Sequence, residues 1–288
     1  MSVKTIGVVG SGQMGGGIAQ VAAVSGLHVV VYDAFPGAIA KCQATHKKSL
    51  AKFVEKQKIS QADMDAALSR ISYVETLDGL AKVDWVVEAI VEDAKVKKDL
   101  FAKLAAMLTR DDIVLATNTS SISITEIATA TGAAAHRVVG MHFFNPVPLM
   151  GLVEVIPGLA TSPEVTERTI ALATAMGKTP LKANDRAGFV SNRVLMPMIN
   201  EAFYAWMEGV AEPEAIDGIM KLGCNFPMGP LRLADFIGLD TCVHIMNVLA
   251  DGLNNDRYRA CPLLKQLVTA GRLGDKSGRG VYDYSKKA

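Results

Sequence analysis

A histidine and a glutamate twelve residues apart are the side chains in this sequence best suited to acid–base chemistry. His142 ends the apolar run RVVGMH, and Glu154 lies inside the apolar run LVEVI. Burying a carboxylate is costly unless it has a partner, and the histidine is the natural one. A carboxylate bonded to one ring nitrogen raises the basicity of the other, as a general base requires. A purely structural ion pair is the alternative.

A glycine-rich turn near the start of the chain is suited to holding phosphate groups. The string GSGQMG follows the apolar run TIGVV and opens a helical stretch. Gly10 permits a tight turn, Gly12 lets the backbone approach a pyrophosphate, and Gly15 lets the helix pack close to its strand. The first helical residues, including Gln13 and Met14, offer unpaired N–H groups and a positive dipole end to the phosphates.

An acidic residue after the second apolar run indicates which cofactor is bound. Asp33 follows HVVVY about twenty residues after the turn, as in dinucleotide-binding βαβ units. Its carboxylate can accept both hydroxyls of an adenosine ribose and would repel a 2′-phosphate. Neither Ala34 nor Phe35 supplies a compensating positive charge. The sequence therefore predicts NAD rather than NADP.

The elements that must position these residues alternate along the first part of the chain. From residue 3 to about 182, short β-branched runs alternate with helical stretches, which is typical of right-handed βαβ crossovers and a parallel sheet with helices on both faces. Two helices are expected between residues 36 and 70, where a plain mononucleotide unit needs one short connection. The predicted fold is α/β, a Rossmann-type doubly wound sheet in residues 1–183 with this helical excursion after the second strand.

The last third of the chain contains no further β-branched run. An all-α domain is expected in residues 184–288, with helices at 188–208, 213–222, 229–251 and 260–271. These helices are rich in Leu, Met, Ile and Phe, so part of their surface is expected to face the first domain or a second subunit.

Polar residues follow two strands in the second half of the sheet. TNTSS follows DIVLA, and HFFNPVP begins with His142 after RVVGM. Because ligands bind at the carboxyl ends of parallel strands, Asn118, Ser120, His142 and Asn145 are expected to converge near a nicotinamide. Asn118 and Ser120 could instead cap the helix that starts near Ile122.

Charge is nearly balanced, with 30 Lys and Arg against 29 Asp and Glu, so no overall field attracts nucleic acid or an anionic membrane. The helical excursion is a local exception, because Glu55 is the one acid between residues 41 and 58. Its basic residues are Lys41, His46, Lys47, Lys48, Lys52, Lys56 and Lys58. A ligand with several phosphates could dock there, and an ordinary solvated helix face is the alternative.

Composition indicates the class of protein and the compartment in which it is expected. Half of the 288 residues are hydrophobic, enough for a sizeable core, and the four cysteines lack metal-like or redox-pair spacing. No metal site is predicted. The first apolar run begins at Val3, and no segment approaches eighteen uninterrupted apolar residues. We therefore expect a cytoplasmic protein with reduced thiols and no membrane segment.

Taken together, the motifs make the whole chain similar to the short-chain L-3-hydroxyacyl-CoA dehydrogenase family, and within it to the bacterial members that act on 3-hydroxybutyryl-CoA. The resemblance rests on GVVGSGQMGGGIAQ, VVEAIVED, ATNTSSISITEIA, MHFFNPVPLMGLVEVI, GFVSNRVLMPMINEA, GPLRLADFIGLD and GDKSGRGVYDY, in this order. It implies NAD-dependent interconversion of an L-3-hydroxyacyl-CoA and a 3-ketoacyl-CoA such as acetoacetyl-CoA. It also implies a homodimer formed through the C-terminal helical domain.

The resemblance implies roles for individual residues. His142 matches the catalytic base and Glu154 the acid that orients it, while Ser120 and Asn192 match residues that hydrogen-bond the reacting oxygens of the substrate. Since Asn192 belongs to the second domain, the active site would be a cleft closed by both domains. The residues that match dinucleotide contacts are Glu92, Lys97, Asn145 and Lys276, and those that match coenzyme A contacts are Ser49 and Lys56.

One segment departs from the family pattern. TGAAAHRVVGMH is one residue longer than the common spacing, and we place the extra residue in the loop 132–135, which makes Ser120 rather than Ser121 the substrate serine. Two alternative functions are a dehydrogenase of small free β-hydroxy acids and a nucleotide-binding homologue without catalysis. The lysine-bearing excursion and the spacing of His142 and Glu154 disfavour the first. The competent residues at all four catalytic positions disfavour the second.

Overall fold

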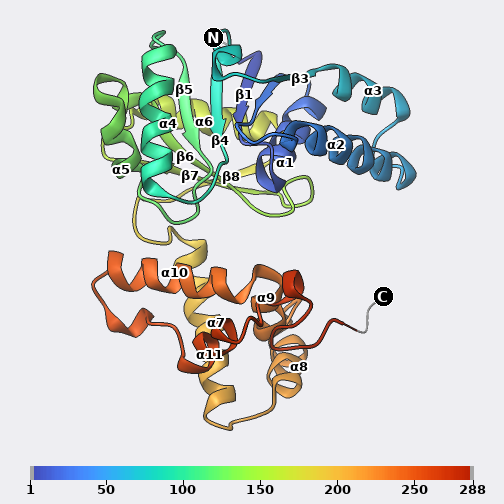
Figure 1. Ribbon diagram of the computed structural model, residues 1–288, viewed down its shortest axis with the longest axis vertical. Helices are drawn as coiled ribbons and strands as arrows, with labels where there is room; N and C mark the ends of the chain where they lie inside the picture. Colours follow the sequence, from blue (N-terminus) through green and yellow to red (C-terminus); the bar gives the residue numbers. More distant parts are fainter. Residues whose placement is uncertain (1–2, 286–288) are drawn as a thin grey trace. The chain divides into compact units, whose positions relative to one another are not determined.

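The computed structural model describes residues 3–285 and divides the chain into two compact units, Met1–Asp185 and Arg186–Ala288 (Figure 1). Each unit has a buried hydrophobic cluster of its own, built in the first from strands and helices and in the second from helices. A Rossmann-like sheet followed by a helical unit is the fold that the sequence predicts.

The first unit contains one eight-stranded sheet in the order β3-β2-β1-β4-β5-β6-β7-β8. Its strands are β1 (Thr5–Val9), β2 (His28–Tyr32), β3 (Ile71–Val74), β4 (Trp85–Glu88), β5 (Val114–Thr117), β6 (Val138–Phe143), β7 (Leu152–Pro157) and β8 (Thr179–Lys182). All neighbours are parallel except β6 and β7, where the expectation of a parallel sheet is wrong. The connection 144–151 is too short for a parallel return, which needs about a dozen residues or more.

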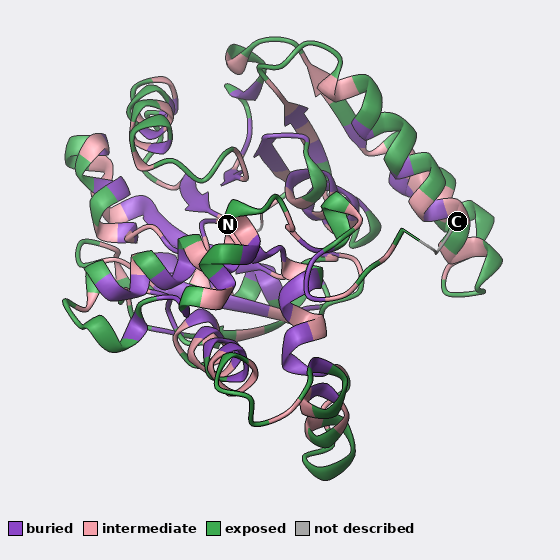
Figure 2. Ribbon diagram, turned by 60° about the horizontal axis from the view of Figure 1, so that its bottom comes forward, coloured by how far each residue is buried: buried purple, intermediate pink, exposed green. Residues whose placement is uncertain are grey.

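Helices cover both faces of this sheet. They are α1 (Gln13–Val24), α2 (Ala38–Glu55), α3 (Gln61–Ser69), α4 (Ala94–Met107), α5 (Ile124–Ala128) and α6 (Pro163–Ala175), with short 3-10 turns η1 (Leu77–Leu80) and η2 (Thr129–Arg137). Val139 and Met141 pack into the cluster that contains α1 and α6, whereas a Cβ at Gly140 would meet Ile124 of α5. Because successive residues of a strand point to opposite faces, α5 lies on the other side from α1 and α6. Figure 2 shows the strands buried, with exposed residues on the outer sides of the helices.

The two helices expected after the second strand are α2 and α3. Ser60 starts α3 through a capping box, in which its Oγ accepts from the Asp63 N–H and its own N–H donates to the Asp63 carboxylate. The basic residues of α2 are exposed except for His46, which is 1% exposed. Counting His46 with the basic surface is therefore wrong.

His46 instead joins three elements. Its Nε2 donates to the Gly16 carbonyl in α1 at 2.7 Å, and its Nδ1 accepts from the Tyr73 hydroxyl in β3 at 2.7 Å. Burial outweighs the bond to Gly16 and lowers the pKa of His46, so the ring is neutral at pH 7.

The second unit contains α7 (Ser191–Met207), α8 (Pro213–Gly223), α9 (Pro230–Ile237), α10 (Leu239–Gly252) and α11 (Pro262–Thr269), with 3-10 turns η3 (Asp256–Tyr258) and η4 (Asp275–Ser277). The single helix expected over 229–251 is wrong. Gly238 adopts φ 102°, which ends α9, and α10 leaves at 96° to it. Asp235 then accepts N–H bonds from Val281 and Tyr282, which fastens the last segment to α9.

Among residues 3–285, no single helix combines the length and apolarity needed to cross a membrane, and the bent pair α9 and α10 passes that test only when both are counted together.

Candidate active site

His142 and Glu154 face each other across the antiparallel pair formed by β6 and β7. Their Cα atoms are partners in the ladder between β6 and β7, and Nδ1 of His142 lies 2.8 Å from Oε2 of Glu154. Both residues are buried, at 7% and 3% exposure. The short return of the chain after β6 thus places two residues that are twelve positions apart directly opposite each other in register.

The bond to Glu154 determines the tautomer of His142. An ionised carboxylate only accepts hydrogen bonds, so the proton lies on Nδ1 and the lone pair of the neutral ring lies on Nε2. The ring of Phe144 lies 4.6 Å from the imidazole, centroid to centroid, and packs against it. The arrangement holds the ring in one orientation with one tautomer.

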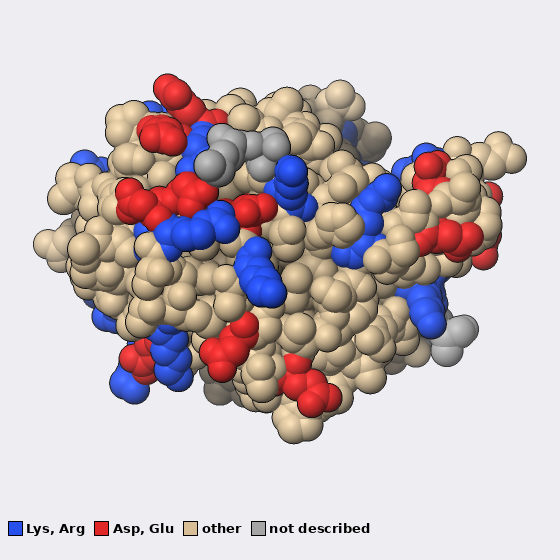
Figure 3. Space-filling model, turned by 90° about the horizontal axis from the view of Figure 1, so that it is seen from above, with Lys and Arg blue, Asp and Glu red and all other residues tan. Residues whose placement is uncertain are grey.

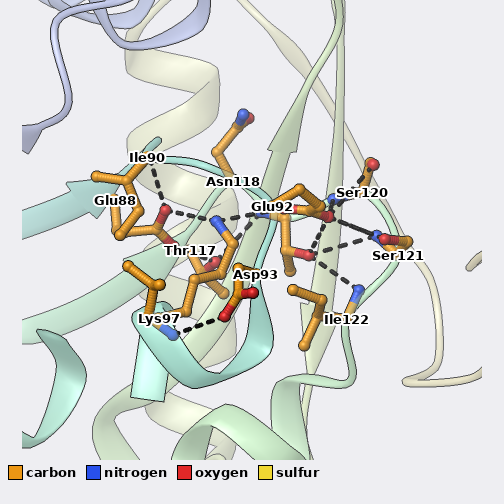
Figure 4. A network of polar contacts seen from close by, with 12 residues as sticks. Glu88, Ile90, Glu92, Asp93, Lys97, Thr117, Asn118, Ser120, Ser121 and Ile122 are labelled. Atoms are coloured by element: carbon orange, nitrogen blue, oxygen red, sulfur yellow. Dashed lines mark hydrogen bonds and ion pairs between the residues drawn. The ribbon is translucent and has the colours of Figure 1, made fainter. Parts of the chain in front are cut away.

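A second buried pair lies at the ends of β4 and β5 (Figure 4). Lys97 of α4 is 1% exposed, and its ammonium lies 2.5 Å from Oε1 of Glu88, which is fully buried. Oε1 of Glu88 also accepts from the Ile90 N–H, and Oε2 accepts from the Thr117 hydroxyl at 2.7 Å. Both oxygens of this carboxylate are therefore engaged.

Glu92 extends this network to the segment that carries the candidate substrate serine. Its Oε2 lies 3.3 Å from the Lys97 ammonium, while its Oε1 accepts from the Thr119 hydroxyl and from the N–H groups of Ser120 and Ser121. Burial alone would raise the pKa of Glu92, but Lys97 and these hydrogen bonds outweigh it and hold the pKa below its usual value. An ionised Glu92 thus fixes the start of the segment after β5.

The glycine turn has the geometry that a dinucleotide requires. Gly10 adopts φ 97°, and a Cβ at Gly15 would overlap the Gly10 carbonyl, so neither position accepts a larger residue without strain. A Cβ at Gly12 would meet nothing within 4 Å, which leaves the approach to the start of α1 open. The turn and the helix N-terminus therefore fit a pyrophosphate.

The other predicted residues of the first unit lie in different surroundings. Asp33 is half-buried just after β2, and Asn145 is exposed in the connection after β6. Oδ1 of Asn118 accepts from the Phe143 N–H at 2.8 Å, so this amide joins the ends of β5 and β6. In α2, Ser49 is half-buried and Lys56 is exposed at the C-cap, two helical turns further on.

Two predicted residues belong to the second unit. Asn192 is buried in the first turn of α7, and Lys276 is exposed in η4, where its ammonium lies 2.6 Å from Asp240.

Sequence reasoning missed Glu88, Thr117 and Thr119. Glu88 carries the same signal that identifies Glu154, since it is a carboxylate embedded in the apolar run WVVEA. The two threonines carry no such signal, because a threonine in or just after a strand is ordinary.

Charged side chains of both signs share the surface of the described residues. On the face shown in Figure 3, basic and acidic side chains are interspersed. A hollow of about 920 Å³ in the first unit is lined by charges of both signs: Lys4, Asp84, Arg110, Asp111, Asp112 and Arg168.

The glycine turn, the doubly wound sheet and the histidine–carboxylate pair define a dinucleotide-dependent oxidoreductase. Residues 5–186 match the model of the 3-hydroxyacyl-CoA dehydrogenase NAD-binding domain, and residues 188–284 match the C-terminal domain of the same family. The chain belongs to the 3-hydroxyacyl-CoA dehydrogenase family, and NAD is its cofactor.

Several similar proteins match this chain over nearly its full length. A probable 3-hydroxybutyryl-CoA dehydrogenase of Deinococcus radiodurans is 56% identical over 96% of this chain and 99% of that protein. One of Bacillus subtilis is 54% identical over 100% of this chain and 99% of its own length. The crystal structure of (S)-3-hydroxybutyryl-CoA dehydrogenase from Ralstonia eutropha has a TM-score of 0.95 at 47% identity, and covers 99% of this chain and 100% of that one.

Proposed function

We propose that this protein interconverts L-3-hydroxybutyryl-CoA and acetoacetyl-CoA with NAD, using His142 as the general base. The observation that carries the proposal is the 2.8 Å bond from Nδ1 of His142 to Glu154, which puts the lone pair of the ring on Nε2. The bacterial relatives named for 3-hydroxybutyryl-CoA, which match the chain over its full length, support this substrate.

In the oxidising direction, Nε2 of His142 takes the proton from the 3-hydroxyl group of the substrate. Bound NAD supplies the acceptor for the hydride that leaves C3. Glu154 stabilises the imidazolium that forms, because its carboxylate already accepts the Nδ1 proton. In the reducing direction the imidazolium returns its proton to the substrate oxygen.

Ser120 and Asn192 are proposed to hydrogen-bond the reacting oxygens of the substrate, and Glu92 positions Ser120 by accepting its N–H. We propose that the glycine turn, Asp33, Asn118, Asn145 and Lys276 contact NAD. Lys97 is proposed to act mainly through the two carboxylates that it holds, since only 1% of it is exposed.

Ser49 and Lys56 are proposed to contact coenzyme A from one face of α2. We further propose a cytoplasmic homodimer formed through the second unit, where Val194 of α7 and Ile219 and Leu222 of α8 are exposed apolar side chains. Sedimentation equilibrium would show a species of twice the 30.6 kDa chain mass, and a monomer would contradict this part of the proposal.

The deciding experiment is NADH oxidation with acetoacetyl-CoA, with free acetoacetate in a parallel assay. Turnover of acetoacetyl-CoA and none of the free acid is expected. Turnover of free acetoacetate alone would favour a dehydrogenase of free β-hydroxy acids, and NADH binding without turnover of either would favour a homologue without catalysis.

The coenzyme A contact is tested by Lys56→Met against Lys41→Met, both exposed cations of the same excursion. Lys56→Met should raise the KM for acetoacetyl-CoA and leave the KM for NADH unchanged, whereas Lys41→Met should change neither. Equal effects of the two substitutions would mean that Lys56 makes no specific contact with coenzyme A and that both lysines act by general electrostatic attraction.

A further inference from the structure

Ser11, the residue between the first two glycines of the turn, holds the carboxylate of Asp33. The Ser11 N–H donates to Oδ2 of Asp33 at 2.7 Å, and the Ser11 hydroxyl donates to the same oxygen at 2.7 Å. On the other side, the Phe35 N–H donates to Oδ1 at 2.9 Å. Three donors from two segments therefore restrain one carboxylate.

The Ser11 hydroxyl restrains the Asp33 carboxylate in a way that the backbone alone does not. Any residue at position 11 would offer the N–H, and a separate bond from the Gly10 N–H to the Tyr32 carbonyl at 2.8 Å already ties the turn to the end of β2. Ser11 is 6% exposed, so its hydroxyl is largely shielded from water. Its specific effect is thus on the side chain of Asp33 rather than on the path of the backbone.

We propose that Ser11 is a positioning residue for cofactor selection, which acts by fixing the Asp33 carboxylate in the orientation that excludes a 2′-phosphate. A carboxylate held by donors on both oxygens cannot rotate away from an approaching anion without breaking a charge-assisted hydrogen bond. Oδ2 receives two donors from Ser11 and Oδ1 receives one from Phe35, so Oδ1 retains one lone pair for a single ribose hydroxyl rather than for both. The inference rests on the proposed role of Asp33 toward the ribose.

Ser11→Ala removes the hydroxyl and keeps the N–H. The KM for NADH should rise about three- to tenfold, because the Asp33 carboxylate loses one restraining intramolecular hydrogen bond, whose typical net contribution corresponds to a factor of this size. The preference for NADH over NADPH in kcat/KM should fall by a similar factor, since a freer carboxylate can turn away from the 2′-phosphate. The KM for acetoacetyl-CoA should not change.

Ser25→Ala is the matched control, because the Ser25 hydroxyl donates to the Val21 carbonyl at the other end of α1. It should leave both KM values and the cofactor preference unchanged. Ser11→Thr, which keeps a hydroxyl, should retain most of the preference. Thermal unfolding of each variant identifies a loss of folding, and NADH fluorescence titration measures cofactor binding independently of turnover.

Asp33→Asn separates the inference from the proposal on which it rests. If Asp33→Asn leaves the cofactor preference unchanged, the role of Asp33 is wrong. If Asp33→Asn relaxes the preference but Ser11→Ala does not, only the role of Ser11 is overturned. If Ser11 acts through Asp33, its effect must disappear when both substitutions are combined, and simple additivity would contradict the inference.

Discussion

Glu88 and Glu154 are two buried carboxylates with different partners. Glu88, at the end of β4, pairs with Lys97 and accepts further bonds from Thr117 and Ile90. Glu154, in β7, pairs with His142. A lysine keeps its charge across the neutral range, whereas an imidazole gains and loses a proton there.

Burial of a carboxylate in an apolar strand therefore predicts a partner but not a function. Lys97 and Glu88 form a fixed ion pair that supports the segments after β4 and β5. The pair of His142 and Glu154 is the one that we propose to pass a proton.

Replacing His142 with Ala should have the largest effect on turnover. General acid–base catalysis typically contributes about 10²–10⁴-fold, so kcat should fall by that factor. Thermal unfolding should show a folded protein that still binds NADH. The control is Glu154→Gln, which leaves an imidazole without its orienting charge and should lower kcat while moving its pH profile. Near-native turnover in the His142 variant would show that His142 is not the general base.

Replacing Lys97 with Met should act mainly on stability. It leaves Glu88 as an uncompensated buried charge, which costs about 3–5 kcal/mol of unfolding free energy. The double variant Glu88→Gln with Lys97→Met removes both charges and should regain much of this loss in urea denaturation. A double variant as unstable as the single one would show that the pair is more than an ion pair.

The burial of His46 should make the stability of the protein depend on pH. Burial is the main cause that lowers the pKa of His46 in the folded protein. Below about pH 6.5, His46 is therefore protonated more readily in the unfolded chain than in the folded protein. The unfolding free energy should be fully retained above pH 6.5 and should decrease as the pH falls from there toward the folded-state pKa. Denaturation of the wild type and His46→Asn at pH 7.5 and 5.5 measures this, and an unchanged slope in the variant would refute the assignment.

The exposed pair of Lys98 and Glu126 should have the smallest effect. Its atoms lie 3.0 Å apart, as in the buried pairs, but the side chains are 35% and 48% exposed. Lys98→Met should change the unfolding free energy by only about 0–1 kcal/mol, because solvent screens the charges. A loss as large as that of Lys97→Met would mean that burial is not what distinguishes the pairs.

The sequence alone was enough for the main features of the fold and for the identity of the cofactor. A dinucleotide-binding unit can be recognised from the order of its parts: a strand, the glycine turn, a helix, a second strand and Asp33. Each part restricts the residue type locally, through backbone φ, the helix dipole or the expected ribose contact. The two helices of the excursion and the helical second unit also follow from periodicity. Local patterns do not show where a long apolar helix breaks. The sequence therefore predicts one helix over 229–251, although Gly238 ends α9 within this range.

The register and burial of contacts between separate segments were decided only by the tertiary structure. The apolar run LVEVI predicts that Glu154 needs a partner and His142 is the expected one, but the antiparallel return of β7 sets the register that places the two residues directly opposite each other. Similarly, the family resemblance predicts a dinucleotide contact for Lys97, but its buried pairing with Glu88 arises only when α4 packs against β4. The burial that turns such residues into coupled pairs arises only when the sheet and its helices assemble, because each strand exposes its polar groups until its neighbours cover them.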